Sequence, residues 1–331
     1  MSDTAISSLP QYDTREIRAP GNESIGFATA GNVRHRARLS GMNPNYWYPA
    51  EWASRLKPGE HVETSFWSAP IALFRTEAGE LGAIENRCPH RHLPLTMGKV
   101  TGCNLVCAYH GWAFGRDGRL QSVHHDQFGR ALPRVGVRTY PVRERYGLIW
   151  IFPGDPALAE QVPLPVIANA EGQDRWARIE FDFTWKSHHS MVIDNLCNLT
   201  HLYVHGDLVP FDKTWMTHSR LHGETLEMVW KHTFRPSIAS PLFNLFLDRS
   251  RVDGASQTRS IYKYPYHASD QGGARAINLM LPLSADATRV FTLYYWRTIG
   301  VPLMSDGWRL AMMERMVAPL FRPGTVEIYR Q

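Results

Sequence analysis

Short apolar or alternating runs, separated by turn residues, make up most of the chain from residue 46 to residue 152, a pattern typical of β-strands. Ala69 and Pro70 are expected to form the turn between the first two strands, and Arg116–Arg119 is expected to form a hairpin turn. The predicted strands are residues 61–67, 71–75, 81–84, 104–106, 112–114, 139–142 and 148–152. The pattern predicts a small all-β domain with two loops at one end.

A Pro-rich stretch, residues 153–165, separates this region from a second one with longer strand-like runs. These runs are residues 177–185, 226–230, 276–281 and 289–296. The first of them alternates as an edge strand or a half-buried strand does, and residues 308–321 form an amphipathic helical pattern. The sequence therefore predicts a polar N-terminal arm (1–44), a β domain (45–155) and an α+β domain (156–331).

Composition agrees with two globular domains and excludes some classes of protein. The chain has 331 residues, of which 44% are hydrophobic and 20% charged, so each domain can bury its own core. A net charge of +5 is too small a bias to indicate nucleic-acid binding, although it suits an acidic electron-donor protein. An apolar run long enough to span a membrane and a signal peptide are both absent from the sequence, so we expect a cytoplasmic protein without membrane attachment.

Two short pieces of sequence each contribute one cysteine and one histidine. The first is Cys88-Pro89-His90-Arg91, and the second is Cys107-Ala108-Tyr109-His110-Gly111-Trp112. Such pairs on two loops hold either zinc or a [2Fe–2S] centre in which histidines replace two cysteines, and the spacing alone does not decide between them. The other two cysteines, Cys103 and Cys197, are expected to be free thiols.

The residues around the ligands favour the iron–sulfur alternative. Pro89, the arginine after the first histidine and the Gly111-Trp112 pair are not needed for a zinc site, and together the two pieces resemble the Rieske motif. The resemblance implies a [2Fe–2S] cluster with Cys88 and Cys107 on one iron and His90 and His110 on the other. Because no glycine-rich dinucleotide fingerprint follows a strand, electrons are expected to come from another protein.

A second candidate metal site follows in the later domain. His201 and His205 are four residues apart, so on a helix both imidazoles would lie on one face and reach one metal ion. A histidine pair at this spacing is more often structural than ligating. Here, however, Asp194-Asn195 precedes the pair and Trp185-Lys186 lies upstream, and this arrangement resembles the catalytic motif of the Rieske non-haem iron oxygenases.

That resemblance covers the chain from about Tyr46 onwards and carries definite expectations. It implies a helix-grip catalytic domain with a curved antiparallel sheet, Fe(II) held by His201 and His205, and O₂ as co-substrate. It also implies a homotrimer, a separate NAD(P)H reductase, a ferredoxin in some systems, and hydroxylation, dihydroxylation or O/N-demethylation of a hydrophobic, aromatic small molecule. Asp194, Asn195 and Asn198 are the residues expected to assist catalysis.

Two features depart from the family pattern. Asn198 stands where the family has an aspartate that links the two metal sites, so we expect slower electron transfer or a route through Asp194. The third iron ligand is expected directly after Gln331, with Glu327 as the fallback and Asp306 as a weaker candidate. These departures leave a second hypothesis open, an electron carrier or binding protein with an inactive catalytic domain; a structural zinc protein is the third.

Overall fold

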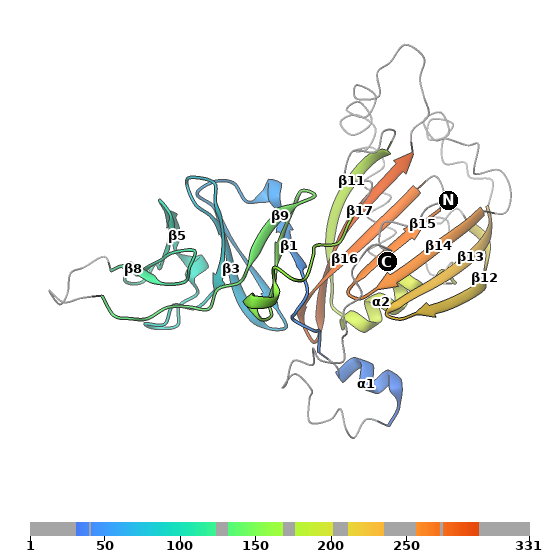
Figure 1. The fold of residues 1–331 in the computed structure, drawn as a ribbon, viewed down its shortest axis with the longest axis horizontal. Coiled ribbons are helices and arrows are strands. Elements are labelled where there is room, and N and C mark those ends of the chain that lie inside the picture. The colour runs from blue at the N-terminus through green and yellow to red at the C-terminus, as the bar shows by residue number, and fades with distance from the viewer. Residues whose placement is uncertain are drawn as a thin grey trace, which may run out of the picture. The chain divides into compact units, whose positions relative to one another are not determined.

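The computed structural model describes residues 31–39, 41–123, 132–167, 176–200, 211–234, 256–271 and 274–297. The chain folds into two compact units (Figure 1). The N-terminal unit comprises Pro10–Leu164 and Leu281–Thr288, and the C-terminal unit comprises Pro165–Met280 and Arg289–Gln331 together with Met1–Leu9. Within the described residues, none of the helices has the length and apolar character needed to cross a membrane.

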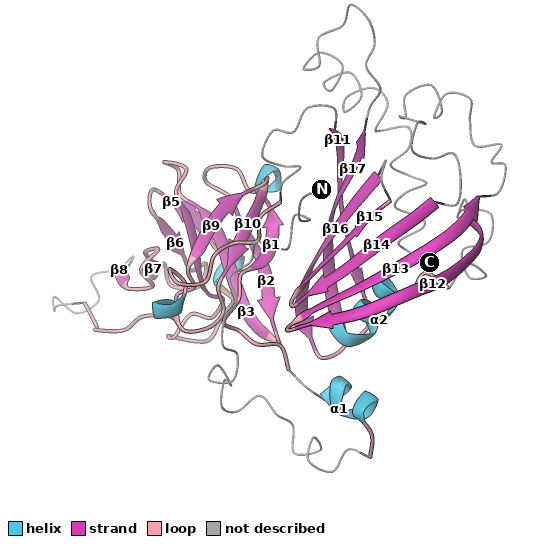
Figure 2. Cartoon of the chain, turned by 45° about the vertical axis from the view of Figure 1, so that its right-hand side comes forward, coloured by secondary structure: helices cyan, strands magenta, loops and turns pink. Residues whose placement is uncertain are grey.

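Three small antiparallel sheets form the N-terminal unit, in the strand orders β1-β10-β9, β2-β3-β4 and β5-β6-β7-β8 (Figure 2). The strands are β1 (Tyr48–Trp52), β2 (His61–Phe66), β3 (Ala69–Arg75), β4 (Leu81–Glu85), β5 (Lys99–Thr101), β6 (Asn104–Val106), β7 (Ala113–Phe114), β8 (Leu120–Ser122), β9 (Val142–Arg145) and β10 (Leu148–Ile151). The short helical segments are α1 (Val33–Leu39), η2 (Ala53–Arg55), η3 (Leu95–Met97) and η4 (Pro156–Leu158). The all-β prediction for this region is confirmed.

The first hairpin of this unit differs from the prediction. Its turn is made by Trp67 and Ser68, both with positive φ, whereas Ala69 and Pro70 already belong to β3. Two successive residues with positive φ give the turn whose twist matches the strands, and this turn normally takes Asn or Gly. Pro70 is tolerated because it lies near the start of its strand, where its carbonyl accepts from the Asn86 N–H.

The strand predicted at residues 139–142 is also displaced along the chain. Thr139 forms only an isolated bridge to Ile84, and the regular strand β9 begins at Val142. Pro141, which has no N–H to donate, separates the bridge from the strand. The remaining predicted strands of this unit agree with the observed ones to within one or two residues.

One seven-stranded antiparallel sheet forms the C-terminal unit, in the order β11-β17-β16-β15-β14-β13-β12. Its strands are β11 (Trp176–Trp185), β12 (Phe211–His222), β13 (Thr225–Phe234), β14 (Ser256–Lys263), β15 (Tyr266–Asp270), β16 (Ala274–Ser284) and β17 (Ala287–Arg297). The sheet is visibly curved and twisted, and α2 (His189–Cys197) lies beside it (Figures 1 and 2). The expected α+β arrangement is therefore confirmed.

Helix α2 packs on one face of this sheet through an apolar cluster. Every second residue of β11 from Ala177 to Phe183 is buried, and these residues pack with Val192 of α2 and with Met280 and Val290 of the neighbouring strands. Burying a side chain of this size stabilises the fold by about 2 kcal/mol, so the cluster fixes α2 against the sheet. We call this face of the sheet the inner face.

Candidate metal centres

The first ligand loop follows β4 and carries Cys88 and His90. The Cys88 N–H donates to Leu93 O at 2.9 Å, and the His92 N–H donates to Cys88 O at 2.8 Å, so the loop folds back on itself. The buried Asn86 side chain clamps the far end of the loop, because it accepts from the Thr96 N–H (2.9 Å) and donates to Thr96 Oγ1 (2.8 Å). Each such bond contributes about 1 kcal/mol, and together they hold the loop in one conformation.

The second ligand loop connects β6 to β7 and carries Cys107 and His110. Its ends are joined by the bond from the Cys107 N–H to Trp112 O at 2.8 Å. Gly111 has φ of 66°, and its N–H donates to Cys107 O at 3.1 Å, so the tight turn expected at this glycine is present.

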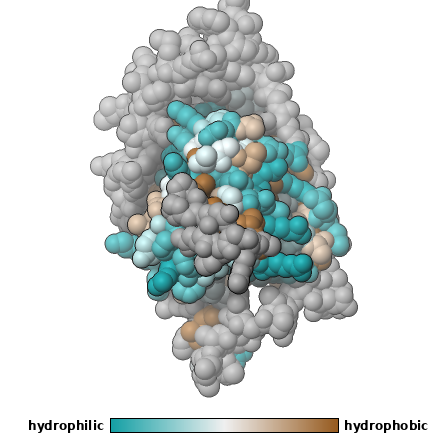
Figure 3. Space-filling view, turned by 90° about the vertical axis from the view of Figure 1, so that its left-hand side faces the viewer, coloured by the Kyte–Doolittle hydropathy of each residue, from teal (hydrophilic) through white to brown (hydrophobic). Residues whose placement is uncertain are grey.

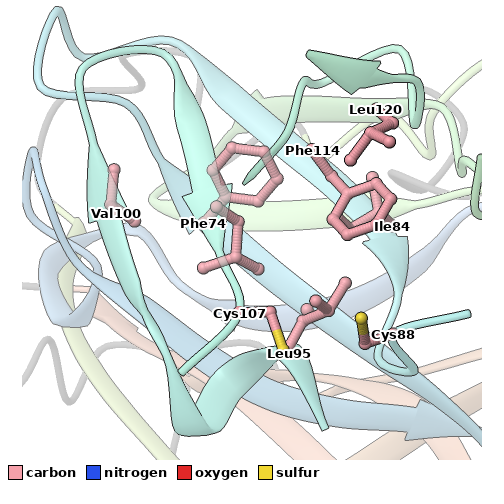
Figure 4. Close-up of a cluster of buried hydrophobic side chains, with 10 residues drawn as sticks. Phe74, Ile84, Cys88, Leu95, Val100, Cys107, Phe114 and Leu120 are labelled. Atoms are coloured by element: carbon pink, nitrogen blue, oxygen red, sulfur yellow. The ribbon is translucent and has the colours of Figure 1, made fainter. Parts of the chain in front are cut away.

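The two cysteines lie together and are buried, with exposed fractions of 2% for Cys88 and 3% for Cys107. Both sulfur atoms lie at the same end of a buried apolar cluster that includes Leu95 and Phe74 (Figure 4). Burial raises the pKa of the Cys88 thiol to about 11, opposed by the backbone N–H groups of His90 and Arg91, which favour the thiolate. Burial thus favours the neutral thiol, whereas the two N–H donors favour the thiolate, which is the form that binds a metal.

The two histidines form a second pair, nearer to solvent. The ring centroids of His90 and His110 are 4.5 Å apart, and His90 is exposed whereas His110 is partly buried. Partial removal from water and the charges of His110 and Arg91 lower the pKa of His90, which favours the neutral imidazole that a metal requires. Tyr109 stacks on His110 with centroids 3.9 Å apart.

These four side chains line one small pocket together with Arg91, Leu93, Tyr109 and Trp112. In the part of the chain that the structure describes, no three His, Cys, Asp or Glu side chains surround a single point as they would around one metal ion. The ligands instead form a sulfur pair and a nitrogen pair, and this division fits a two-iron cluster with one pair on each iron. The residues therefore fit the [2Fe–2S] group expected from the sequence.

The surface around this site carries few apolar residues. Figure 3 looks onto the side of the N-terminal unit that carries β5 and β8, and the described surface there is mainly hydrophilic with small hydrophobic spots. Exposed Tyr109 and Met97 are the large apolar side chains of the two ligand loops that reach solvent. The free thiol of Cys103 is also exposed, whereas Cys197 is buried and burial raises its pKa to about 12, so both agree with the expected free thiols.

Helix α2 carries Asp194 and Asn195 and ends before the segment that holds His201 and His205. Helix α2 stops at Cys197, and Asn198 has an extended backbone. Asn198 Oδ1 accepts from the Thr200 N–H at 2.8 Å and from Thr200 Oγ1 at 2.6 Å, and this local turn replaces the next helical hydrogen bonds. His201 and His205 come after the end of α2 in the chain.

The predicted catalytic residues Asp194, Asn195 and Asn198 are exposed at the C-terminal end of α2. His201, His205, Asp306, Glu327 and the helix expected at residues 308–321 lie outside the described residues, so their roles stay predictions. His188 caps the N-terminus of α2, since its Nδ1 accepts from the Ser190 N–H at 3.2 Å.

Sequence reasoning missed a group of buried polar side chains on the inner face of the sheet. Ser260, His267, Asn278 and Thr292 are at most 2% exposed, and consecutive members are joined by hydrogen bonds. Polar residues at alternate positions of a strand normally predict a solvent-facing side, so nothing in the sequence signalled their burial.

Comparison with known proteins agrees with the fold and the ligand loops. Residues 46–141 match the Rieske [2Fe-2S] domain, and residues 185–318 match the vanillate O-demethylase oxygenase C-terminal domain. The chain is 42% identical over 280 residues to the 4beta-methylsterol monooxygenase of Methylococcus capsulatus, covering 84% of this chain and 74% of the relative. It is 33% identical over 200 residues to chlorophyllide a oxygenase of Chlamydomonas reinhardtii, covering 60% of this chain and 30% of that relative.

A crystal structure of dicamba monooxygenase bound to 3,6-dichlorosalicylic acid has a similar fold, with a TM-score of 0.64, 23% identity and 87% of each chain covered. A Rieske cluster domain followed by a curved-sheet oxygenase domain defines an oxidoreductase of the oxygenase class. The chain belongs to the Rieske non-haem iron oxygenases, as a terminal oxygenase component. Membership of this family gives the chain a [2Fe–2S] cluster, a non-haem iron and O₂ as oxidant.

Proposed function

We propose that this oxygenase inserts one oxygen atom into a methyl carbon of a hydrophobic ring compound. The observation that carries the proposal is the pairing of a complete Rieske ligand set with a C-terminal domain of the vanillate O-demethylase type. The methylsterol monooxygenase, 42% identical, is named for chemistry on a methyl-bearing ring system, and the substrate named for chlorophyllide a oxygenase is also a large ring compound. Ring hydroxylation and dihydroxylation are the competing outcomes.

The residues of the N-terminal unit suit electron delivery. When bound, the two iron centres supply one-electron transfer and dioxygen activation. Buried Cys88 and Cys107 keep the sulfur side away from water, whereas His90 and His110 bring the nitrogen side to the surface. His90 and His110 would hold the iron nearer to solvent, where an electron-donor protein could approach, and the backbone bonds of the two loops would keep these histidines in place.

Partners are part of the same proposal. We infer a separate NAD(P)H reductase, with a ferredoxin as an optional intermediate, and a homotrimer in which the cluster of one subunit serves the iron of the next. We infer residues 45–155 and 156–331 as the two functional domains, with His201 and His205 as iron ligands and a cytoplasmic location. Asn198 and Asp194, exposed at the end of α2, are proposed to assist the transfer of electrons.

The test is oxygen incorporation. The iron-loaded full chain is incubated with a reductase, NADH and ¹⁸O₂, and with 4-methylsterol, vanillate and toluene as candidate substrates, and products are analysed by mass. Incorporation of one labelled oxygen at a methyl carbon, or formaldehyde release from vanillate, supports the proposal. Rapid reduction of the cluster with no labelled product from any substrate favours the electron carrier with an inactive catalytic domain.

A further inference from the structure

A row of polar side chains crosses the inner face of the seven-stranded sheet. In the strand register Met228 lies opposite Ser260, Tyr262 opposite His267, and His267 opposite Asn278. Residues that lie opposite each other share a face of the sheet. Met228 and Tyr262 pack with residues of α2, so the polar row lies on the face that α2 covers.

The hydrogen bonds along this row run in one direction. Thr292 Oγ1 donates to Asn278 Oδ1 at 2.9 Å, which leaves the Asn278 amide nitrogen, 3.0 Å from His267 Nδ1, to donate to it. His267 Nε2 lies 2.9 Å from Ser260 Oγ. With Nδ1 accepting, a neutral imidazole carries its proton on Nε2 and donates it to Ser260.

His267 is neutral because it is buried. Its exposed fraction is 2%, and burial lowers its pKa to about 4. The Ser260 oxygen is therefore occupied as an acceptor, and its own O–H remains as the donor at the end of the row. The other side chains of the row hydrogen-bond to one another, so the row orients the Ser260 hydroxyl as a donor.

Trp230 supplies a second donor beside Ser260. It lies opposite Thr258 in the register, two residues from Met228, so it is the diagonal neighbour of Ser260 on the inner face. Its exposed fraction is 6%, yet its Nε1–H is buried without a hydrogen-bond acceptor in the structure as described. Buried indole N–H groups normally have a partner, so one left unpaired indicates a place for a ligand atom.

The position of this pair connects it with the metal-binding segment. Trp230 and Met228 form a cluster with Cys197, and Leu199 packs against the same cluster. Leu199 is two residues before His201, the first proposed ligand of the mononuclear iron. A ligand held at Trp230 and Ser260 therefore lies beside the chain segment that leads to the iron.

We propose that the Ser260 hydroxyl and the Trp230 indole N–H together recognise an oxygen acceptor, a carbonyl or hydroxyl oxygen, on an otherwise apolar substrate of this oxygenase. The proposal rests on the proposed function and specifies its substrate class. Both groups are neutral donors, so a cation has no ligand here. The surrounding side chains Met228, Leu226 and Tyr262 suit the apolar skeleton.

Two pairs of probes test this site. 4-Methylacetophenone and 4-ethyltoluene share one carbon skeleton and differ in a carbonyl oxygen; 5α-androstan-3-one and 5α-androstane form the same comparison on a larger skeleton. Binding of each probe to the iron-loaded full chain is measured by calorimetry in detergent, without O₂. In at least one pair the ketone is expected to bind about 100-fold more tightly than its hydrocarbon, about ten-fold for each of the two additional hydrogen bonds.

Three variants identify the residues responsible. Trp230→Phe removes the N–H and keeps a ring, and Ser260→Ala removes the hydroxyl; each is expected to lower the ketone-to-hydrocarbon affinity ratio about ten-fold while hydrocarbon binding stays unchanged. The matched control is Trp215→Phe, an exposed tryptophan of β12 that lies opposite Lys231 in the register and so is on the other face; its ratio is expected to be that of the wild type. Because Trp230 is buried, Ser260→Ala decides the question should Trp230→Phe not fold.

Several results would overturn the site. These are an unchanged ratio in Ser260→Ala, an equal loss in the Trp215→Phe control, or no binding of either ketone. The ¹⁸O₂ measurement separates this failure from failure of the proposed function. If labelled product forms but Ser260→Ala has the wild-type ketone-to-hydrocarbon affinity ratio, the recognition site is refuted and the oxygenase function stands. If Ser260→Ala lowers this ratio but no labelled product forms, the recognition site stands and the oxygenase function is refuted.

Discussion

The imidazole ring of His90 lies parallel to the indole ring of Trp112, with ring centroids 4.7 Å apart and 8° between the planes. The two residues come from different ligand loops, so this contact joins the loops directly at the exposed histidine. Groups that hold a metal ligand in place commonly change metal affinity about 10- to 100-fold when they are removed.

Trp112→Leu is therefore expected to loosen His90 and to release iron from the N-terminal unit about ten-fold faster. The loss is followed as bleaching of the visible iron–sulfur absorbance in the presence of a chelator. Trp112→Phe retains an aromatic face and is the matched control, with a release rate close to that of the wild type. Equal rates in the leucine variant and the wild type would show that the stacking does not hold the ligand.

At Gly98 the backbone that follows the first ligand loop approaches the backbone that leads into the second. A Cβ atom at this position would lie 1.8 Å from the backbone oxygen of Val106, which leads into the second loop. Gly98→Ala is expected to separate the loops and to destabilise the N-terminal unit by about 3 kcal/mol, the upper part of the usual range for overpacking.

The measurement is thermal unfolding of that unit, followed by loss of the iron–sulfur absorbance. Gly31→Ala is the control, since a Cβ there meets nothing within 4 Å. A Gly98→Ala transition at the wild-type temperature would contradict the close approach of the two loops.

Two buried histidines make the stability of the C-terminal unit depend on pH. Burial lowers the pKa of both His267 and His232 from 6.5 to about 4. Between these two values the unfolded chain binds protons that the folded chain does not, so stability is complete above pH 6.5 and falls as the pH is lowered towards 4. When the pH has fallen below both pKa values, His267 has lowered the free energy of unfolding by about 3 kcal/mol.

Hydrogen exchange of the β15 amides reports this loss. We expect protection to fall steeply between pH 6.5 and 4 in the wild type and about half as steeply in His267→Gln, where only His232 remains. His218→Gln, an exposed histidine of β12, is the control and keeps the wild-type slope. A slope unaffected by His267→Gln would mean that this histidine is not kept neutral by burial.

Asn198 is expected to limit electron transfer because its side chain carries no charge. Its Oδ1 accepts twice from Thr200, and a carboxylate at the same position can accept both bonds. Asn198→Asp should therefore preserve the end of α2 and increase the single-turnover rate of electron transfer about ten-fold. Identical rates in the variant and the wild type would remove the idea that a charge is missing at this place.

The ligand loops were predictable because their signal is local. Cys88, His90, Cys107 and His110 lie in two short pieces of sequence, and each piece folds back through bonds between its own residues. The tight turn at Gly111 follows in the same way from one glycine with positive φ. The alternation in residues 177–185 likewise predicted a half-buried strand, and in β11 every second side chain from Ala177 to Phe183 is buried.

Other features depend on contacts that no local pattern shows. Trp67 and Ser68 adopt positive φ although neither residue type favours it, so the turn was predicted two residues late. Helix α2 ends where Asn198 bonds to Thr200 instead of continuing the helical ladder. Ser260, His267 and Asn278 are polar residues of strands, and only the packing of α2 on that face indicates that they are buried.

The content of iron and acid-labile sulfide in the purified full chain tests the central claim most directly. Protein produced with both elements supplied should contain about three irons for every two sulfides, two irons in the cluster and one bound separately. Zinc in place of iron, or iron without sulfide, would contradict a Rieske cluster at Cys88, His90, Cys107 and His110.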